Sequence, residues 1–241
     1  MEVMQSLGCR TVAAELRSGD LDIRGGTRTL ASMIYKDPSQ ALYDALNTGN
    51  GRTAWYGFAF RTHPGYLPNP DPSSPNWNAI FTWHGSIEGG GNPIGIGIAA
   101  KGWTNLNGAQ LTNSSGYTAW PDGRPHVVLE VNGGDSAKWP TGGATALRFA
   151  GPPFEPGHLY RFEMKVTWSD SYQGAIEWWV DGVKYADVTG ISNLQVTNGV
   201  HGNVWPTFEN YRPYTSSFSG TIINYYGGLI TGSTRTDVTV P

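Results

Sequence analysis

Short runs in which apolar and polar residues alternate recur along the chain, and segments rich in glycine and proline separate them. The alternation is strongest at residues 126–132, 160–169 and 175–181. A period of two is that of a β-strand with one face in a core. The same reasoning predicts strands at residues 11–17, 29–35, 53–62, 77–84, 94–98, 218–226 and 229–231.

The breaks between these runs are typical of turns and loops. Asp181-Gly182 predicts a hairpin turn, and residues 64–76 hold five prolines and predict a loop. The best helical candidate is residues 37–47, with Ser39 as its N-cap. Since no repeat of fixed period and no linker interrupts the pattern, it predicts a single all-β domain over residues 1–241, an antiparallel β-sandwich with few short helices.

Charge and composition narrow the classes of function. The 241 residues carry a net charge of −3, so no basic field marks a nucleic-acid-binding protein. No apolar stretch has the length of a membrane span, so we expect no membrane insertion. Residues 1–7 lack the basic and apolar regions of a signal peptide. Three origins stay open: a processed secreted protein, an excised domain or a virion protein, and we expect an extracellular or virion-associated location.

Tryptophan is the strongest general sign of a carbohydrate ligand. The chain has ten tryptophans, and the C–H face of a sugar packs well on an aromatic ring. Trp83, Trp178 and Trp179 lie on predicted strands and are candidate glycan contacts. Because neighbours along a strand point to opposite faces, one of Trp178 and Trp179 belongs to the core. Core packing is the alternative for every tryptophan.

Several motifs, in order along nearly the whole chain, resemble one known family. They are AELR at 14–17, GTR at 26–28, WYGF at 55–58, WNAIFTWHG at 77–85, VTWS at 166–169, EWWVDG at 177–182, FENYR at 208–212 and INYY at 223–226. Together they resemble the heparin lyase I-like polysaccharide lyases, which share a concanavalin A-like β-jelly-roll. The resemblance implies that fold, β-elimination on a uronate-containing acidic polysaccharide, and a chain that lacks the family's first strand.

The resemblance also implies roles for single residues. His84 matches the histidine of the family's Trp-His motif, and Tyr211 matches its proton-transfer tyrosine. Arg28 and Arg212 match positions that meet the substrate carboxylate, because a guanidinium fork suits a planar carboxylate. Glu15 is expected to hold Arg28 or to pair elsewhere. Each of these residues has a structural alternative, as a packed aromatic, a strand-end histidine or a surface charge.

The chain departs from the family pattern at several of these positions. Thr82 stands where the family has glutamine, and Thr207 stands where it has lysine; both are candidate substrate contacts. Leu30 replaces an acidic residue, and Gly227 follows Tyr225-Tyr226 where an aspartate is expected. Calcium occurs in the resembled family, so a structural Ca²⁺ ion stays an alternative, although no metal-ligand spacing in the sequence supports a metal site.

Two readings from different classes therefore remain open. In the first, the chain is a polysaccharide lyase whose His84, Tyr211, Arg28 and Arg212 converge on an acidic glycan. In the second, it is a non-catalytic glycan-binding or structural jelly-roll, for example of a phage tail or virion surface. A hydrolase is the weaker third reading, with Glu163 and Glu177 as its candidate pair of carboxylates.

Overall fold

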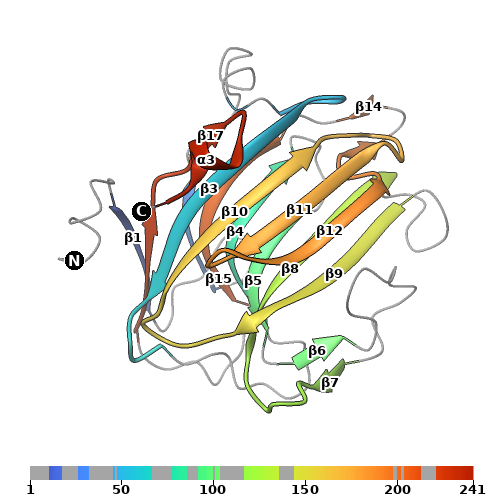
Figure 1. Ribbon diagram of the computed structural model, residues 1–241. Helices are drawn as coiled ribbons and strands as arrows, with labels where there is room; N and C mark the ends of the chain where they lie inside the picture. The colour runs from blue at the N-terminus through green and yellow to red at the C-terminus, as the bar shows by residue number, and fades with distance from the viewer. Residues whose placement is uncertain are drawn as a thin grey trace.

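Two β-sheets stacked face to face make up the protein (Figure 1). The computed structural model describes residues 11–17, 27–32, 46, 48–66, 77–85, 92–99, 101–103, 117–135, 144–197, 200–201, 204–212 and 221–240. Within these residues α3 (Arg235–Val238) is the helix described along its whole length and Leu46 is one further helical position, so the predicted all-β class is confirmed. The predicted helix at residues 37–47 lies almost entirely outside the described residues.

The described part of the first sheet, called sheet A here, has seven strands. In spatial order they are β1 (Thr11–Arg17), β16 (Thr221–Gly227), β3 (Thr53–Thr62), β10 (Leu159–Thr167), β11 (Gly174–Val180) and β12 (Val183–Ile191), with β17 (Ile230–Gly232) also paired to β3. All of these pairings are antiparallel. Strands far apart in sequence lie side by side, as the pairing of β3 with both β10 and β16 shows.

Eight described strands form the second sheet, sheet B. Their order is β14 (Val200–His201), β13 (Gln195–Thr197), β8 (His126–Asp135), β5 (Ile94–Ala99), β4 (Trp77–Gly85), β15 (Val204–Arg212) and β2 (Thr27–Ser32), with β9 (Ala144–Pro153) paired to β8. A small third sheet joins β6 (Lys101–Trp103) to β7 (Tyr117–Ala119). The connections cross between the two large sheets, which gives the jelly-roll arrangement that was expected.

Aromatic rings fill the space between the sheets. Phe58 of sheet A stacks on Phe81 of sheet B with ring centroids 4.4 Å apart. Trp83 is completely buried and meets the ring of Tyr56 edge-on at 4.6 Å. Trp178 is also completely buried in this core. Aromatic pairs of this geometry stabilise a fold beyond the area that they bury.

The outer face of sheet A carries a second, smaller group of aromatic side chains. Trp179 stacks on Trp55 with ring centroids 5.1 Å apart, and the cations of Lys184 and Arg235 lie over the Trp179 ring at 4.7 and 4.6 Å. The C-terminal segment with α3 packs on this face beside β3 (Figure 1). Gly57 allows that approach, because a Cβ atom there would lie 2.0 Å from the Val238 carbonyl oxygen.

No helix in the part of the chain that the structure describes is long and apolar enough to cross a membrane.

Candidate active site

The outer face of sheet B, which points away from the core, carries the candidate site. On β4, Phe81 and Trp83 enter the core, so the alternation of side chains along a strand turns Thr82 and His84 to the outer face. On the neighbouring β15, Phe208 enters the core and Glu209 turns to the same outer face as His84. The strands that build the core therefore also fix the positions of the polar residues behind it.

His84 and Glu209 form a hydrogen-bonded pair across these two strands. His84 Nε2 lies 2.8 Å from Glu209 Oε1, and the side chains are 27 % and 0 % exposed, respectively. The Thr82 hydroxyl donates a second hydrogen bond of 2.6 Å to the same oxygen. Trp205, opposite His84 in the strand register, stacks on the imidazole at an interplanar angle of 17°. The imidazole is thus held by a carboxylate on one side and by an indole face on another.

This arrangement prepares His84 for proton transfer. An ionised carboxylate only accepts hydrogen bonds, so the Nε2 atom carries the hydrogen in the pair with Glu209. That bond fixes the tautomer of the neutral ring, and Nδ1 is then the nitrogen that gains or gives a proton. The buried carboxylate also stabilises the imidazolium that forms when Nδ1 takes a proton.

The backbone register places the other family positions beside this pair. Tyr211 of β15 lies opposite Ala79 of β4 and opposite Arg28 of β2, and Arg212 lies opposite Thr27. Ala79 lines a cavity on the outer face of sheet B. The side chains of Tyr211, Arg28 and Arg212 lie outside the described residues, so their expected roles stay predictions.

The cavity next to the His84–Glu209 pair has a volume of about 250 Å³. Gly95 and Gly97 of β5 form its floor, Thr82 stands on one side, and Glu130 and Asn132 of β8 stand on the other. A closed cavity of about 150 Å³ is enough for a benzene ring. This cavity therefore has room for one sugar ring within reach of the strand that carries His84.

A second polar group lies behind Glu130. Arg148 of β9 pairs with Glu130, with Nε 3.1 Å from Oε1, and donates a 3.0 Å hydrogen bond from Nη1 to Asn132 Oδ1. The Arg148 side chain is only 12 % exposed. A guanidinium held on two sides in this way fixes the Glu130 and Asn132 side chains at the cavity wall.

Several residues predicted as glycan contacts lie elsewhere. Trp83 and Trp178 have no exposed surface, so neither ring can stack on a sugar. The expectation for Trp83 is wrong because the aromatic core needs its ring, whereas Trp178 is the one of the adjacent pair that belongs to the core. Trp179 does alternate with Trp178 as predicted, yet it faces outward on sheet A, under Lys184 and Arg235. Glu15 is an exposed residue of β1 on sheet A, and its expected pairing with Arg28 stays a prediction because the Arg28 side chain lies outside the described residues.

Thr82 and Thr207 do lie on the strands that carry the site. They are directly opposite each other on β4 and β15, and both are buried. Thr82 reaches Glu209 as described above. Within the described residues the Thr207 hydroxyl has no hydrogen-bond partner, so it is a polar group beneath the site with unused bonding capacity.

The alternative pair of carboxylates, Glu163 and Glu177, lies on sheet A. Glu163 is bonded to Arg235, and Glu177 to both Lys165 and Lys184. The hydrogen bond from Lys184, with a smaller contribution from Lys165, lowers the pKa of the Glu177 carboxyl. Two ion-paired carboxylates on the face opposite to the cavity do not support the hydrolase reading.

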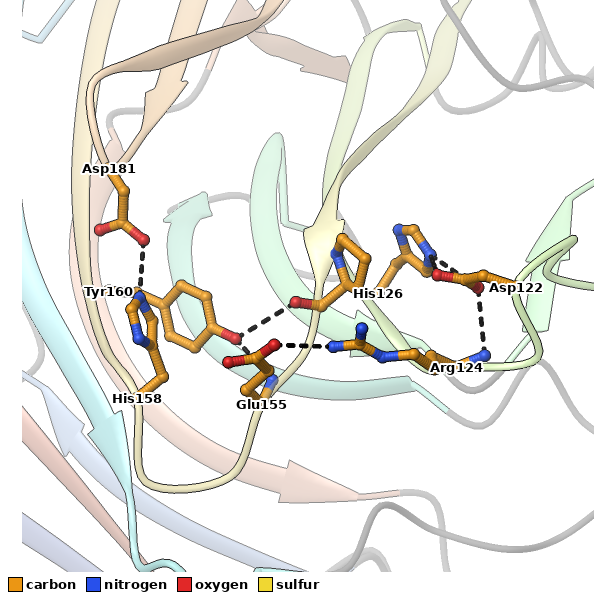
Figure 2. A network of polar contacts seen from close by, with 8 residues as sticks. Asp122, Arg124, His126, Glu155, His158, Tyr160 and Asp181 are labelled. Atoms are coloured by element: carbon orange, nitrogen blue, oxygen red, sulfur yellow. Dashed lines mark hydrogen bonds and ion pairs between the residues drawn. The ribbon is translucent and has the colours of Figure 1, made fainter.

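A polar network at one end of the sandwich contains two described histidine–aspartate pairs (Figure 2). His126 Nε2 lies 3.1 Å from Asp122, and His158 Nε2 lies 2.8 Å from Asp181. Arg124 joins this end to Glu155 at 2.9 Å. Burial raises the pKa of Tyr160 in the middle to about 12. The network ties turns to strand ends, and the cavity at Gly95 is not lined by any of its residues.

Metal binding finds no support among the described residues, where no group of three or more histidine, cysteine, aspartate or glutamate side chains lies close enough to hold an ion. The structural calcium ion stays a prediction.

Sequence reasoning missed Glu209, Trp205, Glu130 and Arg148 as site residues. A signal for Glu130 was present, because it interrupts the apolar run of residues 126–132 on the face opposite to Val127, Leu129 and Val131. Nothing in the sequence showed that Glu209 would meet His84, since 125 positions separate them. The pairing of β4 with β15 alone creates that contact.

Comparisons with known proteins agree with the fold. The family model described as polysaccharide lyase matches residues 7–216. A glucuronan lyase from Trichoderma reesei has a similar structure, with a TM-score of 0.63 and 14 % identity over 95 % of this chain and 83 % of its own. A variant of alginate lyase Aly36B in complex with alginate trisaccharide has a TM-score of 0.56 and 15 % identity over 93 % and 82 %, respectively.

No curated protein matches the sequence. The two structural likenesses concern the fold, whereas the family model spans most of the chain. The chain belongs to the polysaccharide lyase family.

Proposed function

We propose that the protein cleaves a uronate-containing polysaccharide by β-elimination on the outer face of sheet B. The observation that carries the proposal is the His84–Glu209 pair beside a cavity with room for one sugar ring. Membership of the polysaccharide lyase family supports the reaction type. The names of the structural neighbours, a glucuronan lyase and an alginate lyase, support a polymer of uronic acids as the substrate class.

The reaction needs three things from the protein. The C5 proton of the uronate must be removed, the C4–O4 bond must break with formation of a C4–C5 double bond, and the leaving O4 must take a proton. His84, held by Glu209, accepts the C5 proton. The Tyr211 phenol, which the register places in the neighbouring strand, donates a proton to O4. No water is added, so the products together have the mass of the substrate.

Charge on the uronate carboxylate must also be stabilised as the proton leaves C5. Arg28 of β2 lies opposite Tyr211 of β15, and a guanidinium is suited to a planar carboxylate in a bidentate geometry. A cation placed where charge develops lowers the barrier most. We assign Arg28, which lies opposite Tyr211 in the register, to the uronate that is cleaved. Arg212 follows Tyr211 directly along β15, so it takes the same role only if the chain bends at Pro213.

The proposal also covers the subfamily, the acidic nature of the substrate and the location of the protein. Kinship with the heparin lyase I-like members rests on the motifs around His84 and Tyr211. The acidic nature of the substrate rests on the arginine positions and on the printed names of the neighbours. An extracellular or virion-associated location follows from the size of a polysaccharide, which is met outside the cell.

The test is the ultraviolet absorbance of the new C4–C5 double bond, which is conjugated with the carboxylate. Wild type is incubated with glucuronan, alginate, glycosaminoglycans and a neutral glucan, beside His84→Ala and the control Glu177→Gln on sheet A. We expect absorbance to rise with at least one acidic polymer for wild type and Glu177→Gln only. Binding of an acidic polymer without any rise would instead identify a non-catalytic glycan-binding domain.

A further inference from the structure

The cavity over Gly95 has a chemical character of its own. In strand register, Thr82 of β4 lies opposite Gly95, Gly95 lies opposite Glu130 of β8, and Glu130 lies opposite Arg148 of β9. Neighbouring strands are about 4.8 Å apart, so Thr82 and Glu130 face each other across about 10 Å. That gap is wide enough for a pyranose ring to lie on the glycine between them.

Gly95 leaves this gap open although the fold does not require glycine there. A Cβ atom on Gly95 would have only the Thr82 methyl group within 4 Å, at an ordinary contact distance of 3.7 Å. Gly97 differs, because a Cβ atom there would lie 2.9 Å from the Asn78 carbonyl oxygen. Packing explains Gly97, whereas an empty floor beneath a ligand explains Gly95.

Glu130 gives the cavity wall a negative charge that faces the ring. Its Oε1 atom pairs with Arg148, and Oε2 has no partner among the described residues. Arg148 is also bonded to Asn132 and to the Leu147 carbonyl oxygen, so it is engaged behind the wall and does not line the cavity. A carboxylate accepts hydrogen bonds from hydroxyl groups and repels a sulfate ester.

We propose that the Gly95 cavity is a subsite for the unsubstituted hydroxyl edge of a sugar ring, with Glu130 as the acceptor that selects unsulfated glycans and Arg148 as the residue that positions it. The inference rests on the proposed function, because it assumes that this face holds the glycan. It narrows the substrate class, since sulfated uronate polymers such as heparin carry an ester where the hydroxyl edge would lie.

The test compares one glycan in two forms. Oligosaccharides of glucuronan and of alginate are used as they are and after chemical O-sulfation, and both kcat/KM for the unsaturated product and the affinity measured by calorimetry are determined. Wild type should prefer the unsulfated form by about tenfold or more, because like charges in a desolvated site discriminate strongly. Glu130→Gln keeps the size of the side chain and leaves Arg148 without its counter-charge, so this preference should largely disappear.

Two further variants separate the explanations. Gly95→Val fills the cavity and should weaken binding of both forms, whereas Glu177→Gln, a matched change on sheet A, should leave the preference unchanged. The subsite is contradicted if the enzyme forms product without preferring the unsulfated oligosaccharide, or if Glu130→Gln keeps that preference. Neither result contradicts the lyase reaction. If wild type binds the unsulfated form more tightly, Glu130→Gln loses this difference, and no unsaturated product forms, the subsite is supported and the lyase reaction is contradicted. Absence of binding by every oligosaccharide contradicts both.

Discussion

Glu209 Oε1 lies 2.8 Å from His84 Nε2, and the Glu209 side chain that holds the imidazole is completely buried. The contact joins β4 to β15, and the Thr82 hydroxyl donates to the same oxygen and so fixes the carboxylate in place. A carboxylate in this setting orients the ring and stabilises its protonated form, which are the two properties that a proton-transfer histidine needs. Glu209 is therefore a positioning residue, and its effect on the reaction passes through His84.

Replacing Glu209 with glutamine should lower kcat by about ten- to a hundredfold, less than loss of the base itself, for which factors of about 10² to 10⁴ are usual. The amide keeps the shape of the side chain but removes the charge and offers both a donor and an acceptor. Nitrogen NMR of the His84 ring should show the Nε2-protonated tautomer in wild type and a mixture in Glu209→Gln. An unchanged tautomer would show that Glu209 has only a packing role.

Replacing Tyr211 with phenylalanine removes one hydroxyl and should abolish proton donation to the leaving O4. We expect a loss of about a hundred- to ten-thousandfold in kcat with little change in melting temperature, because the ring remains. A full set of kinetic constants and a thermal melt give the answer. Full activity of Tyr211→Phe would identify Tyr211 as a packed aromatic and remove it from the mechanism.

The two tryptophans nearest to His84 should behave differently. Trp83→Ala opens a cavity in the core and should cost about 3–5 kcal/mol of the free energy of unfolding, which lowers the melting temperature by about 2–4 °C per kcal/mol for a chain of this size. Trp205→Ala removes a partly exposed ring that stacks on His84 and should reduce activity much more than stability. A larger loss of activity than of stability for Trp83→Ala, with the reverse for Trp205→Ala, would place the sugar contact at Trp83.

The outer face of sheet A should make stability depend on pH. The hydrogen bond from Lys184 holds the pKa of Glu177 below its ordinary value of 4.5. Because the folded-state pKa is the lower one, the ionised carboxylate stabilises the fold above that value, and this contribution disappears as the pH falls through the folded-state pKa. Melting temperatures from about pH 6 to about pH 3 should fall less steeply for Glu177→Gln than for wild type. Parallel curves would mean that the ion pairs contribute nothing.

Most of the strand pattern was predictable because one face of each strand is apolar. The strand at residues 53–62 has the predicted bounds, whereas β9 was missed because its Gly-Pro-Pro end is typical of a loop. Alternation also failed inside β4, where Ile80 and Phe81 are adjacent and both enter the core. The register shift there turns Ala79 and Thr82, three positions apart, toward the same cavity.

The site was predictable only in part for a related reason. His84 could be singled out by its motif, but its partner Glu209 depends on which strands become neighbours, and a local pattern carries no information about that. The large tryptophans misled the prediction, because the same ring that suits a sugar also fills the space between two sheets. Trp83 and Trp178 serve the core, and the smaller Gly95 opens the site.

The most direct test of the central claim, that the face bearing His84 and Glu209 performs an elimination, is the mass spectrum of the products from a defined uronate oligosaccharide. The account predicts fragments whose masses add up to that of the substrate, with an unsaturated residue at the new non-reducing end, and no such fragments from His84→Ala. Fragments that together exceed the substrate by one water would show hydrolysis and contradict the account, as would unsaturated products formed equally fast by His84→Ala.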